Sequence, residues 1–469
     1  MTMLSRRDAL RQAAALSVGF GGLQALVRRL EAAPALRDHP ARGYGPLVPD
    51  PRGVMDLPRG FAYTIFSRTG DRMDDGLFVP ALHDGMAAFP GPDGLTVLVR
   101  NHEISPAAPR LGPWGWSNEL LDRIDPDALY DPGVDGNPKV GGTTTLVYDT
   151  RRQTLRKHFL SLSGTSRNCA GGPTPWGTWI TCEETEERAG EENAADHGYN
   201  FEVPARPDAG LTKAVPLRDM GRFSHEAVAV APDTGIVYQT EDRHDGLIYR
   251  YLPDVPGELA RGGRLQALAI LDQPARDTRN WPRDDGSPAP DPLPVGGVVP
   301  VRWLDLEDVE SPNSDLRFRG YDAGAARFAR GEGMWYGRKS VFFACTNGGG
   351  AQKGQIWRYV PSPFEGTAEE QTFPGRLELF VESAEDDLLR YADNLTVAPT
   401  GDLVIAEDGR GRDRLIGITP QGEQYEIAAN VFNTSELAGV TFSPDGSTLF
   451  VNMQSPGLTL AITGPWSSR

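Results

Sequence analysis

Cysteine is scarce in this 469-residue sequence, which contains only Cys169, Cys182 and Cys345. Three cysteines are too few for a disulfide scaffold in an exported protein, and an odd number leaves at least one thiol unpaired. The separation of Cys182 and Cys345 permits a disulfide but does not require one. An unpaired thiol is usually a buried structural residue, but it can also bind a metal.

The sequence also has no excess of positive charge. Its 47 Lys and Arg residues are outnumbered by 64 Asp and Glu residues, which gives a formal net charge of −17. A nucleic-acid partner requires a basic surface that neutralises phosphates, so none is expected. An acidic excess suits solubility or the binding of cations.

The sequence also lacks a membrane-spanning run and several common catalytic motifs, which reduces the number of possible functions. After the first 35 residues no apolar run is long enough to span a membrane, so no stable membrane insertion is expected. No serine-hydrolase elbow, Walker loop or Rossmann fingerprint occurs in a suitable context. Serine hydrolases and nucleotide- or NAD-dependent enzymes therefore have no support, and metal chemistry remains.

Glycine and proline, in contrast, are abundant. The 54 Gly and 39 Pro residues are spread along the chain between short apolar runs. This composition is typical of many strands joined by tight turns. We therefore predict an all-β protein without long helices.

Residues 1–35 differ from the rest of the chain. Arg6 and Arg7 precede a weakly apolar stretch at residues 13–27, and residues 33–35 form an Ala-Pro-Ala cleavage site. This pattern indicates a twin-arginine export signal, with an ordinary amphipathic helix as the alternative. We expect the export machinery to be a partner and the mature protein to be periplasmic or extracellular.

Six later segments share one design: a residue that commonly binds metals, an apolar run, a turn with Pro or Gly, and a second apolar run. Their opening residues are Asp84, Cys169, Glu226, Glu332, Asp393 and Glu436. In four segments a proline follows six positions later, at Pro90, Pro175, Pro232 and Pro399. The Glu332 segment turns at Gly337, and the Glu436 segment has its proline eight residues on, at Pro444.

Each segment matches the inner hairpin of a four-stranded propeller blade. Six copies predict a six-bladed β-propeller, which residues 36–469 are expected to form as a single domain. The uneven spacing of the copies indicates long insertions. Residues 106–142, 185–222 and 273–299 are predicted to be surface excursions.

In a propeller the innermost strands line a central channel, and their starting ends meet at one mouth of it. The six opening residues should therefore converge. Converging carboxylates repel one another and acquire raised pKa values unless cations neutralise them. The alternative is that these acids hold neighbouring blades together as hydrogen-bond acceptors.

Further oxygen donors follow four of the hairpins. They are Asn101 and Glu103, Glu183 and Glu184, Glu241 and Asp242, and Glu407 and Asp408. Such a density of carboxylates and amides suits Ca²⁺ or Mg²⁺. A thiolate does not suit these ions, so Cys169 indicates iron or zinc beside them.

Two arginines stand close to the opening residues. Arg330 precedes Glu332 by two residues, and Arg167 precedes Cys169 by two. On an extended segment both members of each pair face the same side, so either guanidinium can hold a phosphate in a bidentate manner. The alternative for each arginine is an ion pair with neighbouring carboxylates.

Several blocks of the sequence resemble those of PhoX-type alkaline phosphatases. In order they are NCAGGPTPWGTWITCEE, HGYNFEV, GRFSHEAVAV, ARFARGEGMWY, DNLTVAPTGDLVIAEDG and GVTFSPDGSTLFVNMQSPG. The resemblance implies a secreted phosphomonoesterase with a six-bladed propeller and a mixed cluster of Fe³⁺ and Ca²⁺. It implies that Cys169 binds iron and that Arg330 holds the substrate phosphate. The carboxylates that it assigns to iron or calcium are Glu184, Glu226, Glu332, Asp393 and Glu436.

Taken together, the repeat and the resemblance predict that Arg330, Glu332 and Cys169 are catalytic, and that Asp84 and Glu103 also bind metal. The predicted reaction is hydrolysis of a small phosphomonoester by a metal-bound oxygen, in a monomeric enzyme. Two alternatives remain: a non-catalytic calcium-binding propeller that binds a partner, and a calcium-dependent lactonase or phosphotriesterase. A calcium-only enzyme needs no thiolate, so Cys169 discriminates between these functions.

Overall fold

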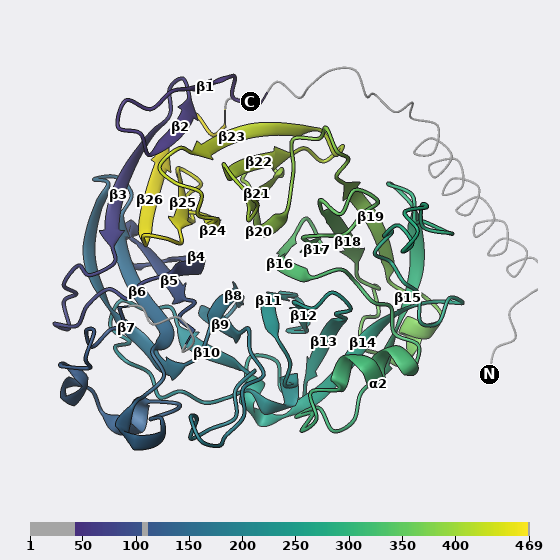
Figure 1. Cartoon of the computed structure of the whole chain (residues 1–469), viewed down its shortest axis with the longest axis horizontal. Helices are drawn as coiled ribbons and strands as arrows, with labels where there is room; N and C mark the ends of the chain where they lie inside the picture. The colour runs from purple at the N-terminus through teal and green to yellow at the C-terminus, as the bar shows by residue number, and fades with distance from the viewer. Residues whose placement is uncertain (1–42, 106–110, 468–469) are drawn as a thin grey trace, which may run out of the picture. The chain divides into compact units, whose positions relative to one another are not determined.

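The computed structural model describes residues 43–105 and 111–467, so the predicted export signal at residues 1–35 lies outside the described residues. Within them the regular secondary structure is almost entirely β-strand, and the strands are arranged around a centre (Figure 1). This confirms the predicted all-β class. In this part of the chain α2 (Leu316–Asp322) is the only α-helix, and no helix is both long and apolar enough to cross a membrane.

Short 3-10 turns occur in several of the connections. They are η1 (Pro92–Gly94), η2 (Leu121–Arg123), η3 (Pro126–Ala128), η4 (Val134–Gly136), η5 (Arg218–Met220), η6 (Leu259–Arg261) and η7 (Ala368–Gln371).

The strands form five sheets, each built from antiparallel neighbours. One contains β4 (His83–Pro90), β5 (Thr96–His102), β6 (Gly141–Asp149) and β7 (Thr154–Thr165), and the next contains β8 (Asn168–Pro173), β9 (Thr178–Glu183) and β10 (Asn200–Pro204). The largest sheet has nine strands in the order β11 (His225–Val230), β12 (Val237–Glu241), β13 (Ile248–Pro253), β14 (Gly263–Ile270), β15 (Val298–Asp305), β19 (Arg376–Glu382), β18 (Gln355–Val360), β17 (Ser340–Cys345) and β16 (Gly331–Gly337).

The last two sheets combine strands from both ends of the described chain. One has the order β20 (Ala392–Val397), β21 (Leu403–Glu407), β22 (Arg414–Ile418), β23 (Gln424–Asn430), β2 (Met55–Pro58) and β1 (Leu47–Val48). The other has the order β24 (Leu437–Phe442), β25 (Thr448–Met453), β26 (Leu458–Thr463) and β3 (Ala62–Arg68). Because β3 completes a sheet of C-terminal strands, the ring of sheets is closed by the chain itself.

Six strands are innermost in this ring. In order around the centre β4 contacts β8, followed by β11, β16, β20 and β24, and β24 contacts β4 again (Figure 1). Each pairs with the next strand in sequence, namely β5, β9, β12, β17, β21 or β25. These are the six hairpins that the repeat predicts. The fold is therefore propeller-like.

The inner strands share a β-bulge at their starting ends. In β4, His83 pairs with His102 but Met86 pairs with Arg100, so one more residue lies on β4 than on its partner. The same shift occurs at the start of β8, β11, β16 and β20. A bulge re-aims the side chains within it. In these five strands the bulged segment opens with Asp84, Cys169, Glu226, Glu332 and Asp393, respectively.

Close approach of the inner strands explains why small residues follow the bulged acids. A Cβ atom on Gly333 would lie 2.6 Å from the carbonyl oxygen of Asp393, and one on Gly85 would lie 2.5 Å from the Cα atom of Ala170. No side chain fits at such distances, since the obstacle in both cases is backbone. The bulges of neighbouring strands are thus packed directly against each other.

Two predicted surface excursions contain core structure, so those predictions are wrong in part. Residues 185–222 include β10, which pairs with β9 and buries Phe201 and Val203. Residues 111–142 bury Trp114 completely. Phe201 and Val203 pack against strands of the neighbouring sheet, and Trp114 packs against loop residues and Leu160 of the outer strand β7. The abundance of turn residues in these segments gives no sign of such packing.

The buried thiols Cys182 and Cys345 lie in separate apolar clusters, and all three cysteines are free. The possible disulfide between them is therefore absent. Both thiols pack as small apolar side chains.

Candidate metal centre

The bulged ends of the inner strands bring the predicted ligands together. Three groups share members: Asp84, Glu103 and Cys169; Cys169, Glu184 and Glu226; and Glu226, Glu332 and Asp393. In each group one ligand atom per residue lies within 4.8 Å of the others. Cys169 and Glu226 each belong to two groups, so the three groups form one continuous cluster. Seven of the eight predicted metal ligands are in it.

Glu436, the eighth predicted ligand, is not a member of these three groups. In β24 the register shift lies between Ala438 and Thr441. A Cβ atom on Gly439 would meet the carbonyl oxygen of Asp84, just as one on Gly333 would meet that of Asp393. Ala438 therefore stands where the other inner strands have their acid or thiol. Glu436 precedes the strand by one residue. Its pKa is nevertheless raised, first by burial and then by Asp84, so it lies within electrostatic range of the cluster.

Four acids stand directly after the second strand of a hairpin. Glu103 follows β5 and Glu184 follows β9, and Asp242 and Asp408 hold the same place after β12 and β21. Asp242 raises the pKa of Glu332 after the larger effect of burial, and Asp408 does the same for Asp393. Asp242 and Asp408 were absent from the predicted ligand set.

Strand alternation explains which acid of each flanking pair points to the centre. The strand-ending residues Glu183, Glu241 and Glu407 turn away and are held by other groups. Glu241 accepts hydrogen bonds from the Tyr249 hydroxyl at 2.8 Å and from the Leu247 amide at 3.1 Å. The acids one residue later therefore face the cluster.

The cluster is costly to ionise without a cation. Burial, followed by the charges of Glu103 and Asp393, raises the pKa of Asp84 well above its usual range. Burial and Asp408 raise the pKa of Asp393 to about 8. The pKa values of Glu184, Glu226 and Glu332 are raised in the same direction, with burial as the main cause. Bound cations would reverse these shifts by stabilising the ionised forms.

Cys169 lies among these acids. Burial, with the charges of Asp84 and Glu226, raises the pKa of its thiol well above the usual range. Its Sγ atom is 3.9 Å from Oδ1 of Asp84. A thiol in negative surroundings is a poor nucleophile, but a bound metal ion deprotonates it. The site therefore favours Cys169 as a ligand rather than as a reactive thiol.

Glu226 offers the clearest test of whether the residues fit a cation. Its side chain is fully buried, and within the described residues neither carboxylate oxygen meets an N–H or hydroxyl donor. Burial and the charge of Asp393 raise the pKa of Glu226 well above the usual range, and they outweigh the nearby Cys169 thiol, which lowers it. A buried carboxylate that no N–H or hydroxyl group meets is strongly unfavourable, and a cation held by Glu226 and its neighbours would satisfy it. The donor set of one thiol and many carboxylates fits a transition-metal ion beside hard cations.

Both predicted phosphate-binding arginines form ion pairs with these acids. Arg330 donates from Nε and Nη2 to the two oxygens of Asp242, at 2.8 and 2.9 Å, and Nη2 also lies 2.8 Å from Oε1 of Glu332. Arg167 Nη2 lies 2.9 Å from Oε1 of Glu103 and 2.6 Å from Oε2 of Glu184.

The expected extended backbone at these arginines is wrong. Arg330 and Arg167 have φ angles of 51° and 49°, in the left-handed region that few residues other than glycine adopt. Leu82 and Tyr391 hold the same position in their strands, two residues before Asp84 and Asp393, with φ angles of 48° and 51°. A residue in the left-handed conformation thus precedes the bulge in four of the inner strands.

Polar side chains outside the predicted set hold the cluster in place. Gln454 donates from Nε2 to Asp84 at 3.0 Å and to Glu103 at 2.8 Å. Asn101, a flanking donor in the sequence, instead donates to the carbonyl oxygens of Cys169 and Ala170, at 3.0 and 2.7 Å. It therefore positions the thiol-bearing strand through its backbone.

His197 is a buried support that the sequence did not single out. Its Nδ1 lies 2.7 Å from Glu183 and its Nε2 lies 2.9 Å from Asp131. Burial lowers the pKa of His197, but the two carboxylates outweigh it and raise that pKa to about 9. Glu183 also accepts hydrogen bonds from the amides of Ser166, Gly198 and Tyr199. This network fixes the strand end from which Glu184 enters the cluster.

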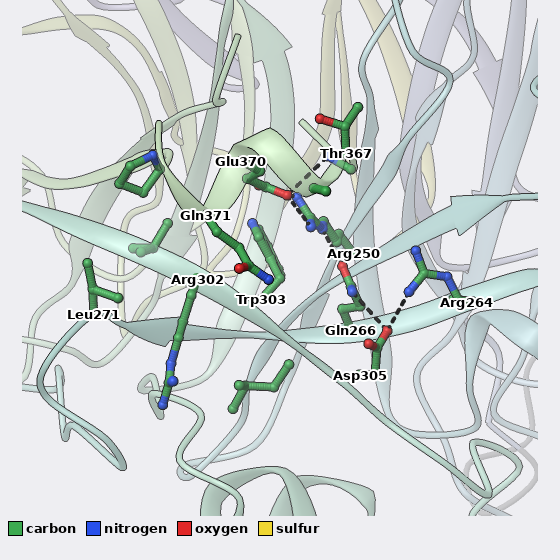
Figure 2. Close-up of a pocket in the computed structure, with 15 residues that line it drawn as sticks. Arg250, Arg264, Gln266, Leu271, Arg302, Trp303, Asp305, Thr367, Glu370 and Gln371 are labelled. Atoms are coloured by element: carbon green, nitrogen blue, oxygen red, sulfur yellow. Dashed lines mark hydrogen bonds and ion pairs between the residues drawn. The ribbon is translucent and has the colours of Figure 1, made fainter. Parts of the chain in front are cut away.

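A cavity outside this cluster is also lined by charged residues. It has a volume of about 570 Å³ and is lined by β14, β15 and the loop around η7. Figure 2 shows that its charged groups already pair within the wall: Glu370 binds Arg250, and Asp305 binds Arg264 and Gln266. Because no ligand-type cluster lines it, this cavity is not the candidate site.

The fold and this site define a propeller-like all-β protein with an acidic, thiol-containing centre. Residues 42–457 match the family model described as alkaline phosphatase PhoX. The chain therefore belongs to the PhoX alkaline phosphatase family and is a phosphatase, a member of the hydrolases. A comparison with curated proteins finds no match.

Solved structures with a similar fold include PhoX from Pseudomonas fluorescens in complex with vanadate, a transition state analogue. It has a TM-score of 0.64 and 18% sequence identity, and the match covers 88% of this chain and 96% of that chain. A gluconolactonase from Xanthomonas campestris has a TM-score of 0.41 and 13% identity, covering 91% of this chain and 100% of that one.

Proposed function

We propose that this protein is an exported, metal-dependent phosphomonoesterase. The observation that carries the proposal is the clustering of Cys169 with Glu184 and Glu226, whose carboxylate lacks any other partner in the described chain. A calcium-dependent lactonase needs oxygen ligands only, so a thiol at this point favours the phosphatase.

We take the architecture to be a six-bladed propeller. Support comes from the six inner strands that contact one another in a ring. The nine-stranded sheet accounts for two blades, because β11–β14 and β16–β19 are two runs of neighbouring strands joined through β15.

The metal centre would be a mixed one. Cys169, with Glu184 and Glu226, would hold iron, and the remaining carboxylates of the cluster would hold calcium. The ions, when bound, supply Lewis acidity and activate the attacking water. The all-oxygen set of Glu226, Glu332 and Asp393 suits calcium because hard cations prefer carboxylate ligands.

Arg330 would bind the phosphate of the substrate. Its Nε and Nη2 atoms already form a two-pronged contact with the carboxylate of Asp242. A phosphate offers the same spacing of two oxygens, so the guanidinium can exchange one anion for the other. Glu332, 2.8 Å from Nη2, would hold the guanidinium in place. Arg167, bound by Glu103 and Glu184, is a second candidate cation for negative charge that develops on the phosphate.

Export would follow from the signal at residues 1–35, through the twin-arginine machinery to the periplasm or the exterior. The mature protein would act as a monomer on a small phosphate ester. Export and the monomeric state are independent of the geometry of the metal cluster.

The experiment is to purify the exported protein, quantify iron and calcium per chain, and assay a phosphomonoester beside a phosphodiester and a lactone. Iron together with monoesterase activity, both lost in Cys169→Ala but kept in the control Cys345→Ala, supports the proposal. Calcium without iron and with lactone turnover would overturn it, as would metal-loaded protein without activity on any ester.

A further inference from the structure

Arg330 is fixed by its backbone between two other segments. Its N–H donates to the carbonyl oxygen of Arg243 at 2.9 Å, and its own carbonyl accepts from the Thr346 N–H at 3.0 Å. The next residues along these segments, His244 and Asn347, are hydrogen-bonded to each other at 3.1 Å. The His244–Asn347 pair is therefore built next to the candidate phosphate-binding arginine.

The insertion at residues 273–299 adds two more side chains to this pair. Trp281 donates from Nε1 to the carbonyl oxygen of Asn347 at 2.6 Å, and Arg279 donates from Nη1 to the carbonyl oxygen of His244 at 3.1 Å. The guanidinium of Arg279 lies 4.3 Å from the centre of the Trp281 ring. The rings of His244 and Trp281 meet edge to face, with centres 5.8 Å apart. We call His244, Asn347, Arg279 and Trp281 the rim cluster.

The rim cluster is accessible, and its one charged side chain is paired. His244 is exposed, and Trp281 and Asn347 are half-buried. The two carboxylate oxygens of Asp277 bind Nε and Nη2 of Arg279 at 2.8 and 2.7 Å, and Arg327 shares the same carboxylate at 3.2 Å. The cluster thus offers aromatic and amide surface to a ligand rather than a second site for an anion.

We infer that the rim cluster binds the organic group of the phosphate ester whose phosphate pairs with Arg330, and that it favours esters with a planar ring. This inference rests on the proposed phosphatase function. Flat rings stack on indole and imidazole side chains regardless of their detailed polarity. A small aliphatic alcohol such as glycerol offers no such face. Residues 273–299, predicted to be a plain surface excursion, would therefore determine substrate preference.

The test compares the metal-loaded wild-type protein with His244→Ala, Trp281→Ala and Trp281→Phe. The measured quantity is the ratio of kcat/KM for nitrophenyl phosphate to kcat/KM for glycerol phosphate, with the inhibition constant of inorganic phosphate beside it. Trp116→Ala is the matched control, because Trp116 is 71% exposed and lies on a different insertion.

We expect the ratio to fall about five- to tenfold in His244→Ala and Trp281→Ala, through a higher KM for the ring-bearing ester. Trp281→Phe keeps a ring and should retain most of the preference, while Trp116→Ala and phosphate inhibition should not change. An unchanged ratio in both alanine variants, or an equal loss on both esters, would overturn the inference while leaving the phosphatase function intact. If the wild-type protein hydrolyses neither ester, the proposed function and this inference both fail.

Discussion

Glu226 lies beside Cys169 at the centre of the ring of sheets, and within the described residues neither of its carboxylate oxygens has an N–H or hydroxyl donor. The two residues come from the bulges of neighbouring inner strands, β11 and β8. A fold that buries a carboxylate and a thiol together without neutralising either is arranged for a ligand of positive charge.

Replacement of Glu226 by Gln should separate metal binding from folding. The variant should lose bound metal and phosphatase activity. Its metal-depleted form should nevertheless be more stable than the metal-depleted wild type at pH 8, by about 1–3 kcal/mol, since a neutral amide replaces a buried group that must otherwise ionise or take up a proton. Denaturant unfolding with metal analysis checks this, with the exposed Glu192→Gln as control. A metal-free variant that is less stable than metal-free wild type would contradict it.

The metal-depleted protein should lose stability as the pH rises. Burial and Asp408 raise the pKa of Asp393 to about 8, above its value in the unfolded chain. The folded state therefore binds a proton that the unfolded state has released, and this stabilisation is complete below about pH 4 and disappears as the pH rises through 8. Melting temperatures measured from pH 5 to 9 should fall more steeply without metal than with it. In metal-depleted Asp393→Asn the slope should be smaller; an identical slope would count against this assignment.

The two carboxylates that bind His197 predict a second pH dependence of the protein's stability. Because its pKa in the folded state is about 9, His197 stabilises the protein fully below about pH 6.5, and this contribution is lost as the pH rises through 9. It amounts to at most about 3 kcal/mol. His197→Gln should be less stable than wild type at pH 6, and the difference should shrink by pH 10, measured with metal bound so that the cluster acids do not titrate. A difference that stays constant with pH would show that the imidazole acts through packing alone.

Phosphatase activity should require the planar, two-pronged guanidinium of Arg330 as well as its positive charge. Arg330→Lys keeps a cation but loses the two-pronged contact now made with Asp242. We expect kcat/KM for a phosphomonoester to fall about a hundredfold in both Arg330→Ala and Arg330→Lys, with metal content unchanged. Arg338→Lys, at another left-handed position, should behave like wild type. Full activity in Arg330→Lys would show that only the charge matters.

The sequence predicted the inner hairpins because the repeat carries both the apolar pattern of the strands and the position of the turn. The alignment started five of the segments at Asp84, Cys169, Glu226, Glu332 and Asp393, and each of these residues opens the bulge of an inner strand. In the last segment the alignment started at Glu436, whereas Ala438, two residues later, holds the equivalent place in β24. A bulge changes the register without leaving a signal in hydrophobicity, so a search for an acid selects the nearest one.

Other parts of the site depend on contacts between distant segments. Asp242 and Asp408 could have been chosen over Glu241 and Glu407 by strand alternation alone, because the strand ends fix which neighbour faces inward. The bond from His197 to Asp131, in contrast, joins two insertions that are 66 residues apart. The rim beside Arg330 likewise unites three loops. No local pattern encodes such pairings.

The most direct test of the account is X-ray absorption at the iron edge, together with metal quantification, on the exported protein and on Cys169→Ala. We predict bound iron with one sulfur atom among its nearest ligands in the wild type, and loss of that sulfur signal with most of the iron in the variant. Active wild-type protein whose metals have only oxygen and nitrogen neighbours would contradict the account.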